Sequence, residues 1–98
     1  MMELNDFIGK VVVSAESKRR FVLRKITSPY IEATTVQRDA QGNCASYRWG
    51  TINGDPISNG ILIFEDAFLK EPFMAAYSAY CHTQAAYYEE MSYWMRKD

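Results

Sequence analysis

The sequence predicts an α+β fold, in which a five-stranded, twisted antiparallel meander, open or half closed as a barrel, packs against one long C-terminal helix. Residues 10–66 hold five short runs rich in β-branched and aromatic residues, and turn-forming residues separate them. From Pro72 to Lys97, large apolar residues then recur every three or four positions, which is the spacing of one helix face. These two patterns predict a sheet followed by a helix.

The length and composition indicate one domain. A chain of 98 residues can bury about two-thirds of its unfolded surface, enough for one core. We expect a single domain over residues 1–98, with a short N-terminal helical turn over 1–9, an antiparallel sheet over 10–66 and a C-terminal helix over 71–97. Uninterrupted apolar runs, such as residues 61–64, are too short to span a membrane. The first residues lack the pattern of a secretory leader, which predicts a cytoplasmic, reduced protein.

The first three strands are predicted from β-branched runs. Residues 11–13 are three consecutive valines, and Gly9 before them suits the left-handed position that ends a helical turn. Residues 20–27 form a second run that stops at Pro29, which cannot donate to a sheet ladder. Residues 30–37 alternate, with Ile31, Ala33 and Thr35 on one face.

The last two strands follow strong turn signals. Asp39, Gly42 and Asn43 are typical hairpin residues and predict a link between the third and fourth strands. Residues 44–49 alternate cleanly, so we expect Tyr47 and Trp49 to be buried. Residues 50–60 form a loop that is long for so small a domain, and residues 61–65 give the fifth strand.

The C-terminal helix is expected to begin near Glu71, because Pro72 fits the first helical turn but not a helix interior. Its apolar face covers an arc wide enough to contact two neighbouring elements at once. The residues on this face are Phe73, Tyr77, Tyr80, Gln84, Tyr87, Met91 and Trp94.

The far end of this helix is a candidate partner interface. About 26 helical residues give a rod of roughly 39 Å, whereas a five-stranded sheet supports roughly 28 Å along its diagonal. The end of the helix would then expose large apolar residues, which soluble proteins usually cover. Either a partner covers them, or the sheet curls and the N-terminal segment folds beneath them as ordinary core. The candidate interface residues are Tyr87, Tyr88, Met91, Trp94 and Met95.

We therefore expect a small, non-enzymatic protein-interaction module that forms a homo-oligomer, or binds another protein, through its C-terminal helix. The alternative is a small barrel that binds nucleic acid through its first hairpin, as basic strands with interleaved aromatic residues do. An isoelectric point of about 5.8 argues against it, and charged edge strands also protect sheets from aggregation. The candidate nucleic-acid residues are Lys18, Arg19, Arg20, Arg24 and Lys25.

No combination of residues indicates catalysis, a metal site or a cofactor. One histidine and two distant cysteines cannot supply a structural zinc set. Cys81 and His82 are adjacent on the predicted helix and diverge by about 100°, so they cannot act together as nucleophile and base. Glycine-rich phosphate-binding spacing is also missing between any predicted strand and helix. We expect no enzymatic activity, no metal and no cofactor.

Overall fold

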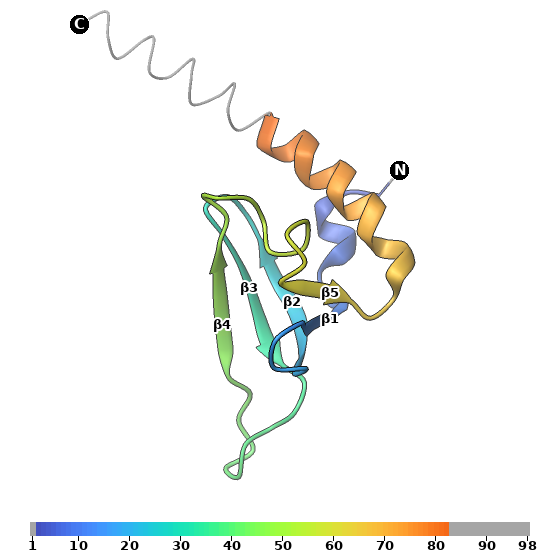
Figure 1. The fold of residues 1–98 in the computed structure, drawn as a ribbon. Helices are drawn as coiled ribbons and strands as arrows, with labels where there is room; N and C mark the ends of the chain where they lie inside the picture. The colour runs from blue at the N-terminus through green and yellow to red at the C-terminus, as the bar shows by residue number, and fades with distance from the viewer. Residues whose placement is uncertain (1, 83–98) are drawn as a thin grey trace, which may run out of the picture.

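The computed structural model describes residues 2–82 and confirms the predicted α+β class (Figure 1). One five-stranded antiparallel sheet packs against a short N-terminal 3₁₀ turn and a C-terminal helix, which occupies residues 70–82 of the described chain. The predicted remainder of that helix, residues 83–97, lies outside the described residues. The labelled elements are η1 (Leu4–Phe7), β1 (Val11–Ser14), β2 (Arg20–Ile26), β3 (Tyr30–Thr35), β4 (Ser46–Gly50), β5 (Leu62–Phe64) and η2 (Ala67–Leu69).

The strand order is β4-β3-β2-β1-β5. The first four strands are successive neighbours, as in a meander, but β5 returns to the free side of β1 (Figure 1). Val12 therefore pairs with Phe21 of β2 on one side and with Phe64 of β5 on the other. β4 and β5 are the two edges, so the sheet is not closed into a barrel. The long loop over residues 50–60 is needed because it carries the chain from one edge to the other.

Three phenylalanines from separate parts of the chain join the two layers. Phe7 of η1 lies 5.8 Å from Phe64 of β5 and 5.3 Å from Phe73 of the helix, centroid to centroid. Phe64 and Phe73 are 5.6 Å apart and pack edge to face. Ile57 of the crossing loop is also buried in this core. The N-terminal turn, the crossing loop and the helix thus cover the same face of the sheet.

The N-terminal turn ends, and the C-terminal helix begins, where the sequence predicts. η1 is followed by Gly9, whose φ of +91° is a conformation that L side chains rarely adopt. Asp66 caps η2, since its Oδ1 accepts a hydrogen bond from the backbone N–H of Phe68 at 3.1 Å. The helix follows η2 directly at residue 70, so Pro72 falls in its first turn, where no backbone donor is required.

Alternation of faces is confirmed in both β3 and β4, but the burial that it predicts is complete only in β3. Ile31, Ala33 and Thr35 are buried, and the residues between them are partly exposed. The prediction that Tyr47 is buried is wrong, because 39% of it is exposed, while Trp49 is half-buried and packs against the core. β4 is an edge strand, and the helix packs on the part of the core face near β5, so its covering does not reach Tyr47.

Candidate functional site

The described end of the C-terminal helix is fixed to the turn between β2 and β3. Tyr77 Oη donates a hydrogen bond to the carbonyl oxygen of Thr27 at 3.2 Å. Tyr80 Oη accepts one from the backbone N–H of Ser28 at 3.3 Å. Since this turn is one end of the sheet, the helix has reached the limit of its support by Tyr80.

Tyr77 is buried in the core beneath the helix, with its hydroxyl near a few polar groups. Burial is the main reason that its pKa is raised from 10.0 to about 12, and Cys81 and Asp55 add to the rise. The Thr51 hydroxyl lies close enough to oppose the rise, although its buried Oγ1 meets no partner at hydrogen-bond geometry among the described residues. The Tyr77 phenol therefore stays neutral at physiological pH and remains a donor to Thr27.

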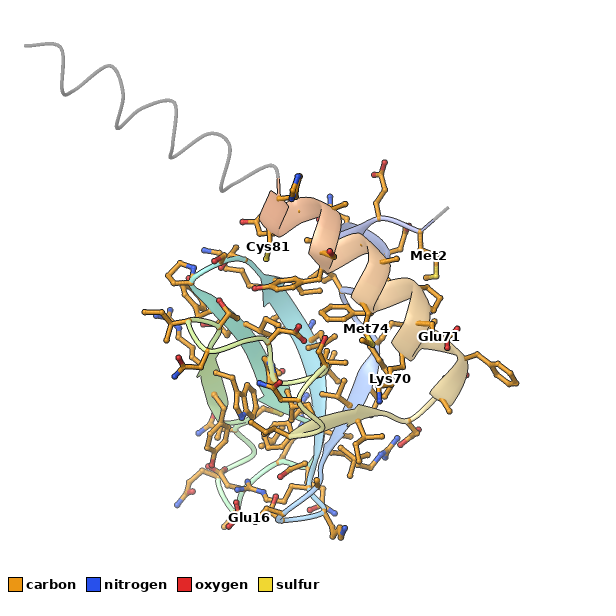
Figure 2. All side chains as sticks on the ribbon, turned by 45° about the horizontal axis from the view of Figure 1, so that its top comes forward. Met2, Glu16, Lys70, Glu71, Met74 and Cys81 are labelled. Carbon is orange, nitrogen blue, oxygen red and sulfur yellow. The ribbon has the colours of Figure 1, made fainter. Side chains whose placement is uncertain are left out.

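An apolar groove of about 940 Å³ runs between the N-terminal segment and the C-terminal helix. Met2 lies beside the helix in this region, and Cys81 lies at the end of its described part (Figure 2). The N-terminal segment and Ile26 of β2 contribute to the lining, and the helix contributes one face with small residues. The described residues that line this groove are Met2, Glu3, Leu4, Asn5, Ile26, Pro72, Ala75, Ala76, Ala79 and Tyr80.

The groove follows a helix face next to the one that enters the core. Phe73 and Tyr77 are buried in the core, whereas Ala75 on the groove side is exposed. At 100° per residue, the groove face has the spacing 72, 75, 76, 79 and lies beside the core face of 73, 77 and 80. The helix thus presents a second apolar face that the described residues do not cover.

Sequence reasoning did not predict this groove. Taken one at a time, the alanines indicate only high helix propensity. Their recurrence at positions 75, 76 and 79, beside the core stripe, is the signal that could have indicated a second apolar face. Its other wall, at Met2 and Leu4, depends on how the N-terminal segment docks, which no local pattern fixes. The predicted partner interface of Tyr87, Tyr88, Met91, Trp94 and Met95 lies outside the described residues.

The five predicted nucleic-acid residues are divided between the two faces of the sheet. Arg19 lies on the core side, where its guanidinium is 5.4 Å from the ring centroid of Tyr47 and 5.9 Å from that of Phe21. Its Nη1 also donates a hydrogen bond to Tyr47 Oη at 3.1 Å. Lys18 lies in the turn before β2 with a φ of +63°. These contacts leave Arg19 on the aromatic edge of the core rather than on the outer face.

Arg20 has a specific ionic partner on the outer face. Its guanidinium donates to both carboxylate oxygens of Glu65, at 2.7 and 3.0 Å. This hydrogen bond, followed by the charge of Glu65, raises the pKa of Arg20. Arg20 is thereby neutralised by a neighbour and contributes little positive charge to the surface.

The remaining basic residues, Arg24 and Lys25, lie on the outer face, where Lys25 contacts Tyr30. The register shift between Leu23 and Lys25 lets consecutive residues of β2 share this side. Arg24 Nε donates to Thr34 Oγ1 at 3.2 Å, and Lys25 Nζ lies 5.5 Å from the Tyr30 ring centroid.

Arg48 of β4 completes this group, although it is absent from the basic patch that the sequence predicts. Its guanidinium lies 4.6 Å from the Tyr30 centroid, and its Nε donates to Glu32 Oε1 at 2.8 Å. The hydrogen bond with Glu32 is the main cause of its raised pKa. Arg48 is distant in sequence from β2, so only the strand pairing could place it here.

Other chemical groups are dispersed. Cys44 is an exposed free thiol and Cys81 is a half-buried one, while His82 is exposed. Across residues 2–82, no three His, Cys, Asp or Glu side chains come together in a way that could hold a metal ion. In the same part of the chain, no helix has the length and apolar character needed to cross a bilayer.

The apolar groove and the outer face of the sheet around Tyr30 are therefore the two candidate binding surfaces of the described residues. Comparisons with protein-family models, with curated proteins and with solved structures find no match to this chain, so these surfaces carry the functional argument.

Proposed function

We propose that this chain is a small, non-enzymatic protein-interaction module that self-associates through its C-terminal aromatic helix. One observation carries the proposal. The described helix already reaches the end of the sheet at Tyr80, which contacts the β2–β3 turn. The sequence then supplies large apolar residues that still need a cover, and the last of them are Met91, Trp94 and Met95.

A second copy is a suitable cover for such residues. Tyrosine, tryptophan and methionine are enriched in the buried centres of protein interfaces, where they bring a large contact area. A homo-oligomer also presents the same apolar residues from each chain, so one symmetric contact covers both sets. We place this assembly in the cytoplasm, where the free thiols of Cys44 and Cys81 would stay reduced.

Light scattering coupled to size exclusion tests the proposal. The wild-type protein should elute as a dimer or larger species, and the double variant Trp94→Glu, Met95→Lys should elute as a soluble, folded monomer. Tyr93→Lys is the matched control, because its position falls on the opposite side of the predicted helix and should leave the assembly intact. A wild-type monomer at high protein concentration would refute self-association.

Nucleic-acid binding is the second candidate, and the group around Tyr30 favours it. Lys25 and Arg48 bring two cations to the Tyr30 ring on the outer face, and Arg24 lies on the same face beside Thr34. Cations around an aromatic platform can hold a phosphate backbone while a base stacks on the ring. Glu32 opposes this use, since it already pairs with Arg48.

Gel retardation of single and double strands at low salt tests this candidate. Replacing Arg24 and Lys25 by glutamine should weaken binding and reduce the salt slope by about one for each cation that no longer meets a phosphate. Arg20→Gln is the matched control, because Arg20 is already paired with Glu65. Unshifted strands with the wild-type protein at low salt would end this candidate.

A further inference from the structure

We infer that the apolar groove between residues 2–5 and the C-terminal helix is the binding site for residues 87–95 of a second copy of this chain. The inference rests on the proposed self-association and adds the surface that receives the aromatic segment. The proposed function names only the segment that is offered, whereas this inference names what it binds.

The size and lining of the groove suit several large apolar side chains. A volume of about 940 Å³ is at the upper end of the range for binding pockets and exceeds what one side chain can fill. Met2, Leu4 and Ile26 supply apolar walls, and Met2 and Leu4 are only partly buried. The alanines at 75, 76 and 79 have short side chains, so a neighbouring helix can approach this helix closely.

The chain's own C-terminal residues are poorly suited to fill its own groove. Residues 83–98 follow directly from the helix that forms one wall. To enter that groove they would have to reverse direction, and a reversal usually needs glycine or proline. Residues 83–98 contain neither. A second copy can instead deliver the same segment without a reversal.

Reciprocal docking of two copies satisfies both surfaces at once. In a two-fold dimer each chain offers one segment and receives one, so the contact is closed and no apolar groove is left over. The two occupied grooves together also bury more apolar area than a single helix–helix contact would, which favours a stable dimer over a transient one.

Charge at the groove agrees with this occupant. Glu3 is the charged residue that lines the groove among residues 2–82, and it is exposed to solvent. Arg96 and Lys97 follow directly after the segment, whereas its own charges, Glu89 and Glu90, lie nearer its start. Two cations arriving beside one carboxylate would help to fix the direction in which the segment lies.

Filling the groove tests the inference directly. Ala75→Phe places a large side chain at an exposed position that lines the groove, away from the buried core. We expect the dimer dissociation constant to rise about tenfold or more, as measured by analytical ultracentrifugation. Ser78→Phe is the matched control, because Ser78 is exposed on the same helix but does not line the groove, and it should leave the dimer unchanged.

The two proposals fail in different ways. Suppose that the Trp94→Glu, Met95→Lys variant is monomeric while Ala75→Phe still dimerises like the wild type. The groove is then not the binding site, but self-association through the segment stands. If the wild type is a monomer, self-association itself has failed. Loss of the dimer in Ala75→Phe but not in Ser78→Phe, with unchanged circular dichroism in both, supports the groove.

Cysteine cross-linking keeps the test decisive if Ala75→Phe does not fold. In a background of Cys44→Ser and Cys81→Ala, copies carrying Ala75→Cys are mixed with copies carrying Ser92→Cys and oxidised. The inference expects the mixed disulfide to form faster than either disulfide between like copies. Equal rates for all three products would overturn it. In a chain carrying both cysteines, a link that forms only within one chain would identify the chain's own segment as the occupant.

Discussion

At the scale of single residues, two phenylalanines close together in sequence have opposite surroundings. Phe73 is fully buried between Phe7 and Phe64, whereas Phe68 is 90% exposed in η2. Local hydrophobicity does not distinguish them, and only the helix start at residue 70 decides which one faces the sheet.

Phe73→Ala should therefore be far more damaging than Phe68→Ala. Removing a buried phenyl ring leaves a cavity and costs about 3–5 kcal/mol of unfolding free energy. An exposed ring away from such contacts changes stability by only about 0.5 kcal/mol. Urea denaturation of both variants measures the difference, and equal destabilisation would contradict the position of Phe73 in the core.

The raised pKa of Tyr77 predicts how stability changes in alkali. Between pH 10 and about 12 the folded state keeps a proton that the unfolded state has lost, so stability should fall as pH rises through this window. Below pH 10 both states are protonated and this contribution is fully present. Tyr77→Phe removes the titrating hydroxyl, so its unfolding free energy should fall less steeply over the same range.

Urea denaturation at a series of pH values compares the two proteins. The other tyrosines titrate in both, so only the difference between the two curves reports on Tyr77. Parallel curves would show that Tyr77 is not protected from ionisation. Tyr77→Phe also loses the hydrogen bond to Thr27, so its stability should be lower at neutral pH by about 1 kcal/mol.

At the scale of elements, the loop over residues 50–60 is held by Asp55. This residue is buried, and its Oδ1 accepts hydrogen bonds from the backbone N–H groups of Ile57 at 3.0 Å and Ser58 at 2.9 Å. Asp39 makes the same kind of turn in the exposed β3–β4 hairpin, where it accepts from Gln41 and Asn43.

Asp55→Ala should cost more than Asp39→Ala because the two turns differ in burial. Removing Asp55 leaves buried backbone donors without an acceptor, which costs about 1.5–3 kcal/mol. Water can replace Asp39 in the exposed hairpin, so its loss should cost less than about 1 kcal/mol. Chemical denaturation measures both, and an equal cost would show that the crossing loop does not depend on this buried carboxylate.

The elements also show which parts of the fold were predictable. Local patterns were enough for β3, whose alternating Ile31 and Ala33 are buried, and for the helix start just before Pro72. The exposure of Tyr47 was not predictable, because it depends on β4 being an edge far from the helix. The pairing of β5 with β1 was equally unpredictable, because a short sequence pattern does not determine which earlier strand a later strand will pair with.

The candidate sites follow the same division. Placing Lys18 to Lys25 together assumed that neighbours in sequence share a surface, but strand alternation sends Arg19 and Arg20 to opposite faces. Arg48 joined the outer group through the pairing of β3 with β4. The apolar groove needs two distant segments to dock, so a pattern on one helix could supply only half of it.

At the scale of the whole molecule, self-association predicts that stability depends on concentration. Binding between folded copies favours the folded state by mass action, so the midpoint of thermal unfolding should rise as the protein concentration rises. The Trp94→Glu, Met95→Lys variant should show no such rise. Differential scanning calorimetry over a wide concentration range provides the measurement, and a constant midpoint for the wild type would contradict a folded oligomer.

The return of β5 to β1 sets the order in which this chain can fold during synthesis. β1 to β4 join through short connections, but Val12 meets Phe64 only across about 50 intervening residues, and such long closures are slow. A nascent chain on the ribosome therefore holds Phe7 and Val12 exposed until Phe64 and Phe73 have emerged. Burial of Phe7 and Val12, unlike the pairing of β1 with β2, therefore depends on synthesis reaching the start of the C-terminal helix.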